Sequence, residues 1–187
     1  MKNEQLRFVL VLIFTFVLSI TGKSWANERY ESTYSIRATP FDGKLASVGF
    51  FEKSIVADKQ PANAQSVESL FQIARAFRYV PHGPDDQWQS TEETAAKGSG
   101  NCADKAVWLY TQLKQNGYDN VRIAIGKYRS IDSIFHVWVT YMDESGISYI
   151  LDPTIQRRPW KIMDFYQNFY RPLYSFGDGI RYRTVSY

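Results

Sequence analysis

The sequence has a single cysteine and two histidines among its 187 residues. One cysteine excludes an internal disulfide, so no disulfide framework organises this chain. The chain also lacks a large excess of positive or of negative charge. Of the 22 basic and 19 acidic residues, three basic and one acidic lie within the first 26 positions, which leaves 19 against 18. A nearly neutral body of this kind argues against nucleic-acid binding.

Internal repeats and low-complexity segments are absent, and no apolar run after the first 26 residues is long enough to span a bilayer. The composition, 44% hydrophobic and 22% charged, is instead typical of a folded globular protein. A chain of this length predicts one domain with a sizeable core.

The amino terminus has the pattern of an export signal. Lys2 and Arg7 precede an apolar run from Phe8 to Ile20, and Ser24-Trp25-Ala26 then places small residues at the −3 and −1 positions of a cleavage site. This pattern predicts a secretory signal peptide at residues 1–26 and a single domain at residues 27–187. We expect a periplasmic or secreted protein with no stable membrane insertion after cleavage.

Apolar periodicity predicts helices at residues 66–79, 91–97 and 102–116. Alternation predicts strands at residues 121–125, 134–142 and 147–151, the last two joined as an antiparallel hairpin. Residues 27–60 are expected to form strand or loop, and the aromatic-rich tail 160–187 to provide core and lid packing. Helices followed by an antiparallel sheet predict an α+β fold.

The single cysteine, Cys102, is predicted at the start of a helix, with Asn101 as its N-cap. Unpaired N–H groups and the positive end of the helix dipole favour a thiolate there. Gly98 and Gly100 would let a substrate backbone approach closely. A nucleophile and a small buried hydrophobe are both consistent with this residue.

His136 is predicted in the middle of an apolar strand, on one face with Ile134 and Trp138. Burying a polar ring there costs free energy unless the ring is hydrogen-bonded, so we expect either hydrogen-bond partners or a functional role. Asp152 ends the next strand of the hairpin, where an antiparallel register can set it beside His136 and orient the imidazole. Alternatively, His136 is a core histidine bonded to a carbonyl, and Asp152 merely begins a turn before Pro153. For His82, in a Pro/Gly loop, we predict no role.

Four segments resemble the transglutaminase-like superfamily, closest to the bacterial transglutaminase-like cysteine proteinases. They are Trp88–Thr94, Gly98–Ala106, Phe135–Val139 and Leu151–Thr154. The resemblance implies a papain-like core, in which a cysteine-bearing helix packs on an antiparallel sheet that supplies His and Asp. It implies Cys102 as nucleophile, His136 as general base and acid, and Asp152 as orienting residue. Trp88 and Asn101 are expected near the substrate or oxyanion cleft.

The sequence departs from this family's usual Gly-Asp-Cys-Glu-Asp stretch, whose acidic residues help to bind calcium in the calcium-dependent members. Here Asn101 and Ala103 flank the cysteine, and only Asp104 is retained. Calcium favours several oxygen ligands, so we expect no metal and no cofactor.

The sequence thus predicts an exported thiol hydrolase that cleaves a peptide or isopeptide bond of a cell-envelope protein or peptide, through a thioester. Two alternatives stay open. One is a transglutaminase-type acyl transferase, and the other is a non-catalytic peptide-binding domain with a vestigial triad.

Overall fold

The computed structural model describes residues 31–51, 64–81, 83, 85, 87–129, 134–162 and 169–186. Residues Ser32–Val185 form one compact unit, and Met1–Glu31 with Ser186–Tyr187 fall outside it. The predicted signal peptide and His82 lie outside the described residues, so both stay predictions. Within the described ranges, no helix has the length and apolar character needed to cross a bilayer.

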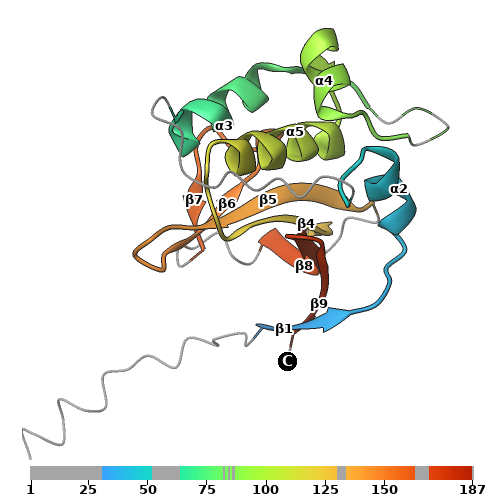
Figure 1. Ribbon diagram of the computed structural model, residues 1–187, viewed down its shortest axis with the longest axis vertical. Coiled ribbons are helices and arrows are strands. Elements are labelled where there is room, and N and C mark those ends of the chain that lie inside the picture. Colours follow the sequence, from blue (N-terminus) through green and yellow to red (C-terminus); the bar gives the residue numbers. More distant parts are fainter. Residues whose placement is uncertain are drawn as a thin grey trace, which may run out of the picture. The chain divides into compact units, whose positions relative to one another are not determined.

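A seven-stranded sheet forms the base of the compact unit (Figure 1). Its spatial order is β1-β9-β8-β4-β5-β6-β7. The strands are β1 (Glu31–Ile36), β4 (Val121–Tyr128), β5 (His136–Met142), β6 (Ser148–Leu151), β7 (Trp160–Lys161), β8 (Tyr170–Gly177) and β9 (Ile180–Ser186). The pairs from β9 to β7 are antiparallel. A separate parallel pair joins β2 (Arg78–Tyr79) to β3 (Ser99–Gly100).

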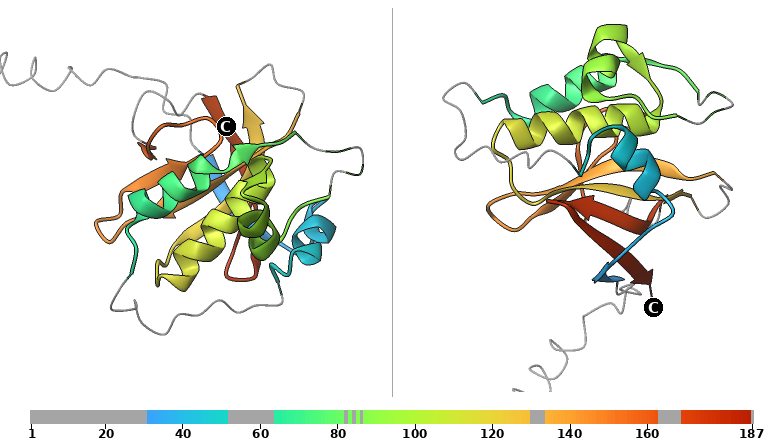
Figure 2. Two further views of the ribbon diagram at one scale, coloured as in Figure 1. Left: turned by 90° about the horizontal axis from the view of Figure 1, so that it is seen from above. Right: turned by 45° about the vertical axis from the view of Figure 1, so that its right-hand side comes forward.

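Helices cover one side of this sheet (Figure 2). The longest, α5 (Cys102–Gln115), packs on β4 and β5, while α3 (Val67–Ala76) and α4 (Thr91–Lys97) pack on α5. Local sequence explains two of their starts, because Ser66 accepts a hydrogen bond from the Ser69 N–H and Ser90 forms a capping box with Glu93. The predicted α+β class, with a cysteine-bearing helix on an antiparallel sheet, is confirmed.

Alternating residues of the central strands divide between two apolar clusters. Val137 and Val139 of β5 pack toward the helices, with Cys102 in the same cluster. Trp138 packs in a second cluster that includes Tyr170 and no helix residue. Period-two alternation places these clusters on opposite faces of the sheet.

Several local predictions are wrong, and each error has a physical reason. The helix predicted to reach Tyr79 ends at Ala76, because residues 78–79 pair with Ser99–Gly100 instead. Residues 42–47, expected as strand or loop, form the short helix α2 (Asp42–Ser47), which buries Leu45. The predicted apolar segment 55–57 lies outside the described residues.

His136 is the first residue of β5 rather than its middle, and Ile134 is 74% exposed instead of sharing a buried face with it. Trp138 does share the face of His136, since the two rings stack at 6.1 Å between centroids. The aromatic tail supplies sheet strands, and β8 lies beside β4 inside the sheet.

A bulge marks the pairing of β4 with β8, and its register shifts between Ile125 and Gly126. A Cβ on Gly126 would overlap the carbonyl oxygen of Arg171 and lie 2.9 Å from Cα of Pro172. Gly126 therefore permits a close backbone approach that no larger residue allows. Gly126 pairs with His136 of the neighbouring strand β5, so the close contact between β4 and β8 lies directly beside the candidate site.

Candidate active site

Cys102 occupies the first position of α5 and is 4% exposed. Asn101 caps the helix as predicted, because its Oδ1 accepts hydrogen bonds from the N–H groups of Ala103 at 2.8 Å and Asp104 at 3.1 Å. The thiol therefore lies at the positive end of a helix of 14 residues. Both the helix dipole and the N–H groups of the first turn favour a negative charge at this position.

Asp104 completes the capping box and also fixes the preceding loop. Its Oδ2 accepts the N–H of Asn101 at 2.9 Å and Nε2 of Gln89 at 3.2 Å, and its Oδ1 accepts the Gln89 N–H at 2.8 Å. A Cβ on Gly100 would lie 2.6 Å from Cβ of Asp104, so this position favours glycine. These bonds tie the segment that carries Trp88 to the start of α5.

His136 and Asp152 meet at the ends of β5 and β6. The register pairs Val139 with Leu151, and its continuation places Asp152 opposite Trp138, diagonal to His136 on the same face. Nε2 of His136 lies 2.6 Å from Oδ2 of Asp152. Asp152 is fully buried and the His136 side chain is 13% exposed.

The carboxylate of Asp152 is held from several directions. Its Oδ1 accepts the N–H groups of Thr154 at 2.9 Å and Ile155 at 3.3 Å, which close the turn after β6. Its Oδ2 accepts the hydroxyl of Tyr170 at 2.9 Å in addition to its contact with His136. Charge-assisted bonds of this kind stabilise the buried carboxylate as an anion.

The electrostatics link all three predicted catalytic residues. Burial lowers the pKa of His136, but hydrogen bonds to Asp152 and Cys102 and the charges of both groups outweigh this effect and raise it to about 10. The imidazole is therefore cationic at neutral pH. Since Nε2 is engaged with Asp152, Nδ1 is the nitrogen left to exchange a proton with the thiol.

The structure thus brings Cys102, His136 and Asp152 together; their catalytic role stays a prediction. Asn101 acts as the cap, and Trp88 is 7% exposed in the same apolar cluster as Cys102. Their predicted part in a substrate cleft stays a prediction as well.

Sequence reasoning missed three residues around this centre. Tyr170 follows Asp152 by 18 positions, and nothing in the sequence signals their contact. Gln156 lies four residues after Asp152. The one sequence signal for it is that a polar residue follows soon after a carboxylate at the end of a strand. Tyr79 was predicted on a helix. Burial and the charge of Cys102 raise the pKa of Tyr79.

The residues around Cys102 do not fit a calcium ion. Both carboxylate oxygens of Asp104 accept N–H donors, and this side chain is 1% exposed. The Asn101 carbonyl oxygen likewise accepts two N–H groups. A calcium ion would have to bind these same oxygen atoms, whose lone pairs already accept hydrogen bonds from N–H groups. Among the described residues, no group of three or more His, Cys, Asp or Glu side chains is arranged to hold a metal.

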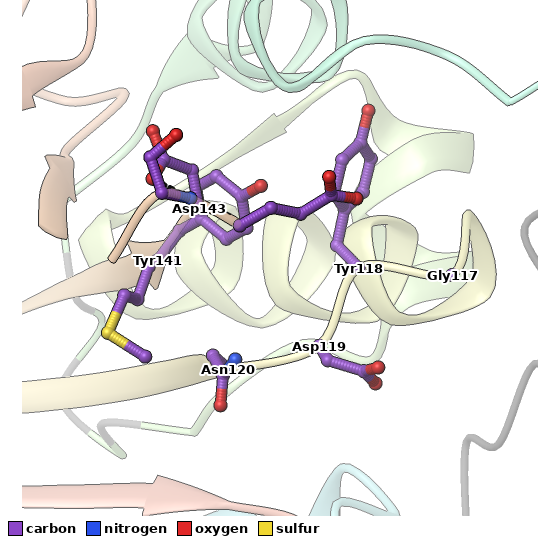
Figure 3. A pocket seen from close by; sticks show the side chains of 9 residues that line it. Gly117, Tyr118, Asp119, Asn120, Tyr141 and Asp143 are labelled. Carbon is purple, nitrogen blue, oxygen red and sulfur yellow. Dashed lines mark hydrogen bonds between the residues drawn. The ribbon is translucent and has the colours of Figure 1, made fainter. Parts of the chain in front are cut away.

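A pocket of about 450 Å³ lies away from this centre (Figure 3). It opens beside the carboxyl end of α5 and the turn between β5 and β6, and Tyr118, Asp119, Tyr141 and Asp143 are among its lining residues. Tyr141 and His136 lie toward opposite ends of β5, so the pocket is separate from the candidate active site.

Comparison with known proteins identifies the fold of this chain. Neither a family model nor a curated protein sequence matches this chain. Three solved structures of LapG from Legionella pneumophila do match, at 23% identity over 75% of this chain. The chain shares its fold with LapG. The TM-scores are 0.51 and 0.52, and the match covers 76–78% of LapG. One LapG structure is calcium-bound and another EGTA-treated.

Proposed function

We propose that this protein is an exported cysteine peptidase or amidase of the transglutaminase-like type, acting through Cys102, His136 and Asp152. The observation that carries the proposal is the 2.6 Å contact between Nε2 of His136 and Oδ2 of Asp152, together with the effect of Cys102, whose hydrogen bonding and charge help to raise the pKa of the same imidazole. A nucleophile, an acid–base group and an orienting carboxylate in this order are what acyl transfer requires.

The fold supports the proposal. The chain shares its fold with LapG of Legionella pneumophila, at TM-scores of 0.51 and 0.52. In both the motif resemblance and the present geometry, the cysteine begins a helix that packs on an antiparallel sheet. The likeness leaves the substrate open.

In the first half of the proposed reaction, Sγ of Cys102 attacks the carbonyl carbon of an amide or isopeptide bond, and an S–C bond forms. The N–H of Cys102, at the positive end of α5, stabilises the oxyanion. The imidazolium of His136 gives its proton to the leaving nitrogen as the C–N bond breaks. A thioester and a free amine result.

In the second half, the neutral imidazole takes a proton from water, and the hydroxide adds to the thioester carbonyl. The C–S bond breaks, which releases the acid and restores the thiolate–imidazolium pair. Asp152 keeps the imidazole in one orientation and stabilises its cation throughout. No metal takes part in these steps.

We infer that the substrate is a protein or peptide of the cell envelope, because the predicted signal peptide directs the chain there. The test uses the purified protein and its Cys102→Ala variant. Each is incubated with an envelope protein extract of the source organism, with and without EGTA, and the products are identified by mass spectrometry. Fragments with new termini from the wild type alone, unchanged by EGTA, are the expected result.

Other outcomes identify the alternatives. Higher-mass adducts with release of ammonia, dependent on Cys102, would identify a transglutaminase. A second measurement follows alkylation of Cys102 by iodoacetamide across pH. The proposal predicts fast alkylation well below pH 8, slowed in His136→Ala. An ordinary thiol, insensitive to His136 and accompanied by no cleavage, would leave the peptide-binding domain as the better interpretation.

A further inference from the structure

Tyr170 reaches the candidate active site from the face of the sheet opposite the helices. It is the first residue of β8, is 3% exposed, and donates its hydroxyl to Oδ2 of Asp152 at 2.9 Å. The same oxygen lies 2.6 Å from Nε2 of His136. The same carboxylate oxygen therefore forms hydrogen bonds with both the tyrosine hydroxyl and the histidine ring.

The direction of the tyrosine proton follows from Gln156, which is 1% exposed. Oε1 of Gln156 accepts the N–H of Asp152 at 3.2 Å, which leaves its Nε2 to donate to the Tyr170 oxygen at 3.3 Å. Since the tyrosine oxygen accepts this bond, its own proton is directed to Asp152. Burial, the charge of Asp152 and the hydrogen bond to it raise the pKa of Tyr170, so the hydroxyl stays protonated.

Packing fixes the ring of Tyr170. Its centroid lies 5.1 Å from that of Trp138 and 5.1 Å from that of Tyr128, and 6.4 Å from that of Trp160. The pairing of β4 with β8 also sets Tyr128 opposite Tyr170. The hydroxyl therefore reaches Asp152 from a fixed position, with little rotamer freedom to lose.

We propose that Tyr170, oriented by Gln156, is a positioning residue that holds Asp152 against His136 and limits how tightly the carboxylate retains the imidazolium proton. The inference rests on the proposed function, since it concerns the same centre. When His136 gives up its Nδ1 proton, the ring loses its positive charge but still donates Nε2–H to Oδ2 of Asp152, and the Tyr170 hydroxyl is the second side-chain donor to that buried oxygen. Without that donor, the deprotonated state costs more, and His136 holds its proton to higher pH.

Other titratable and charged groups also face this pair. They are Cys102 and Lys105 on α5 and Tyr128 on β4; Arg75 on α3 and Tyr79 on β2 interact in turn with Lys105 and Cys102. Lys105 and Cys102 act on the pair and keep their positions when Tyr170 loses only its hydroxyl. Among the described residues, Tyr170 and His136 are the side chains hydrogen-bonded to Oδ2 of Asp152.

The test compares Tyr170→Phe with Tyr128→Phe in the full chain. Each removes one hydroxyl and keeps the ring, and the Tyr128 ring lies 5.9 Å from that of His136. The histidine ring signals are followed by NMR across pH, which is simple in a chain with two histidines. We expect the midpoint of His136 to rise by about one pH unit in Tyr170→Phe, the loss of one charge-assisted hydrogen bond, and to stay unchanged in Tyr128→Phe.

The same variants are alkylated with iodoacetamide across pH, so that the two proposals fail in different ways. If the wild-type thiol is sluggish and His136→Ala changes nothing, the proposed function fails. If wild type and His136→Ala behave as proposed but Tyr170→Phe leaves the His136 midpoint unchanged or lowers it, Tyr170 is an ordinary core residue and this inference is overturned. Circular dichroism checks that each variant is folded.

Discussion

Replacing Gly126 with alanine is expected to destabilise the protein and to disturb the candidate active site. The added Cβ would overlap the Arg171 carbonyl oxygen and would lie 2.8 Å from the carbonyl carbon of the same residue and 2.9 Å from Cα of Pro172. All three atoms are backbone, so no side-chain rotation relieves the contact. The strands β4 and β8 must separate at the bulge.

The cost follows from the kind of contact. Overpacking of a well-packed site typically costs about 1–3 kcal/mol, and separating paired strands adds broken ladder bonds. We therefore expect the free energy of unfolding to fall by about 3 kcal/mol. For a domain of this size, this is a decrease of roughly 6–12 °C in Tm.

Gly43 provides the matched control. It lies in α2, and a Cβ there meets nothing within 4 Å. Gly43→Ala should be neutral or stabilise the protein by about 0.5–1 kcal/mol, through helix propensity. Urea denaturation of both variants measures the difference. Equal midpoints for wild type and Gly126→Ala would refute the argument from the bulge.

The change should also affect the thiol. Gly126 pairs with His136 across β4 and β5, and Arg171 follows Tyr170 directly. Separating β4 from β8 at Gly126 therefore shifts the paired His136 relative to Cys102 and weakens the support that the imidazolium gives to the thiolate. We expect slower alkylation of Cys102 in Gly126→Ala even at temperatures where the variant is folded, whereas Gly43→Ala should match the wild type.

Two further predictions concern capping and pH. Asp104→Ala removes the acceptor of the Asn101 and Gln89 N–H groups, and should lower the free energy of unfolding by about 2 kcal/mol in urea denaturation, while Asp104→Asn should lose less. The pKa of His136 is raised from 6.5 to about 10, so its contribution to stability is fully present below about pH 6.5 and is lost as the pH rises through about 10. The stability advantage of wild type over His136→Gln should therefore shrink between about pH 6.5 and pH 10, and an advantage independent of pH would contradict the assignment.

Local sequence determined where helices α3, α4 and α5 begin. Ser90 with Glu93 and Asn101 with Asp104 form capping boxes within one turn of the chain, so the position of Cys102 at a helix start could be predicted. The turn at residues 143–146 likewise fixed the hairpin. Its register then placed Asp152 near His136, as predicted.

Partners distant in the chain were decided only by tertiary structure. Helical periodicity extended α3 to Tyr79, but pairing with Gly100 draws that residue into a strand. Nothing local predicts that β8 pairs with β4, and the contact of Tyr170 with Asp152 depends on that pairing. Capping and turn bonds join residues two to four positions apart, so a local pattern is enough to specify them. The choice of strand neighbours depends on which apolar faces the whole chain can bury together.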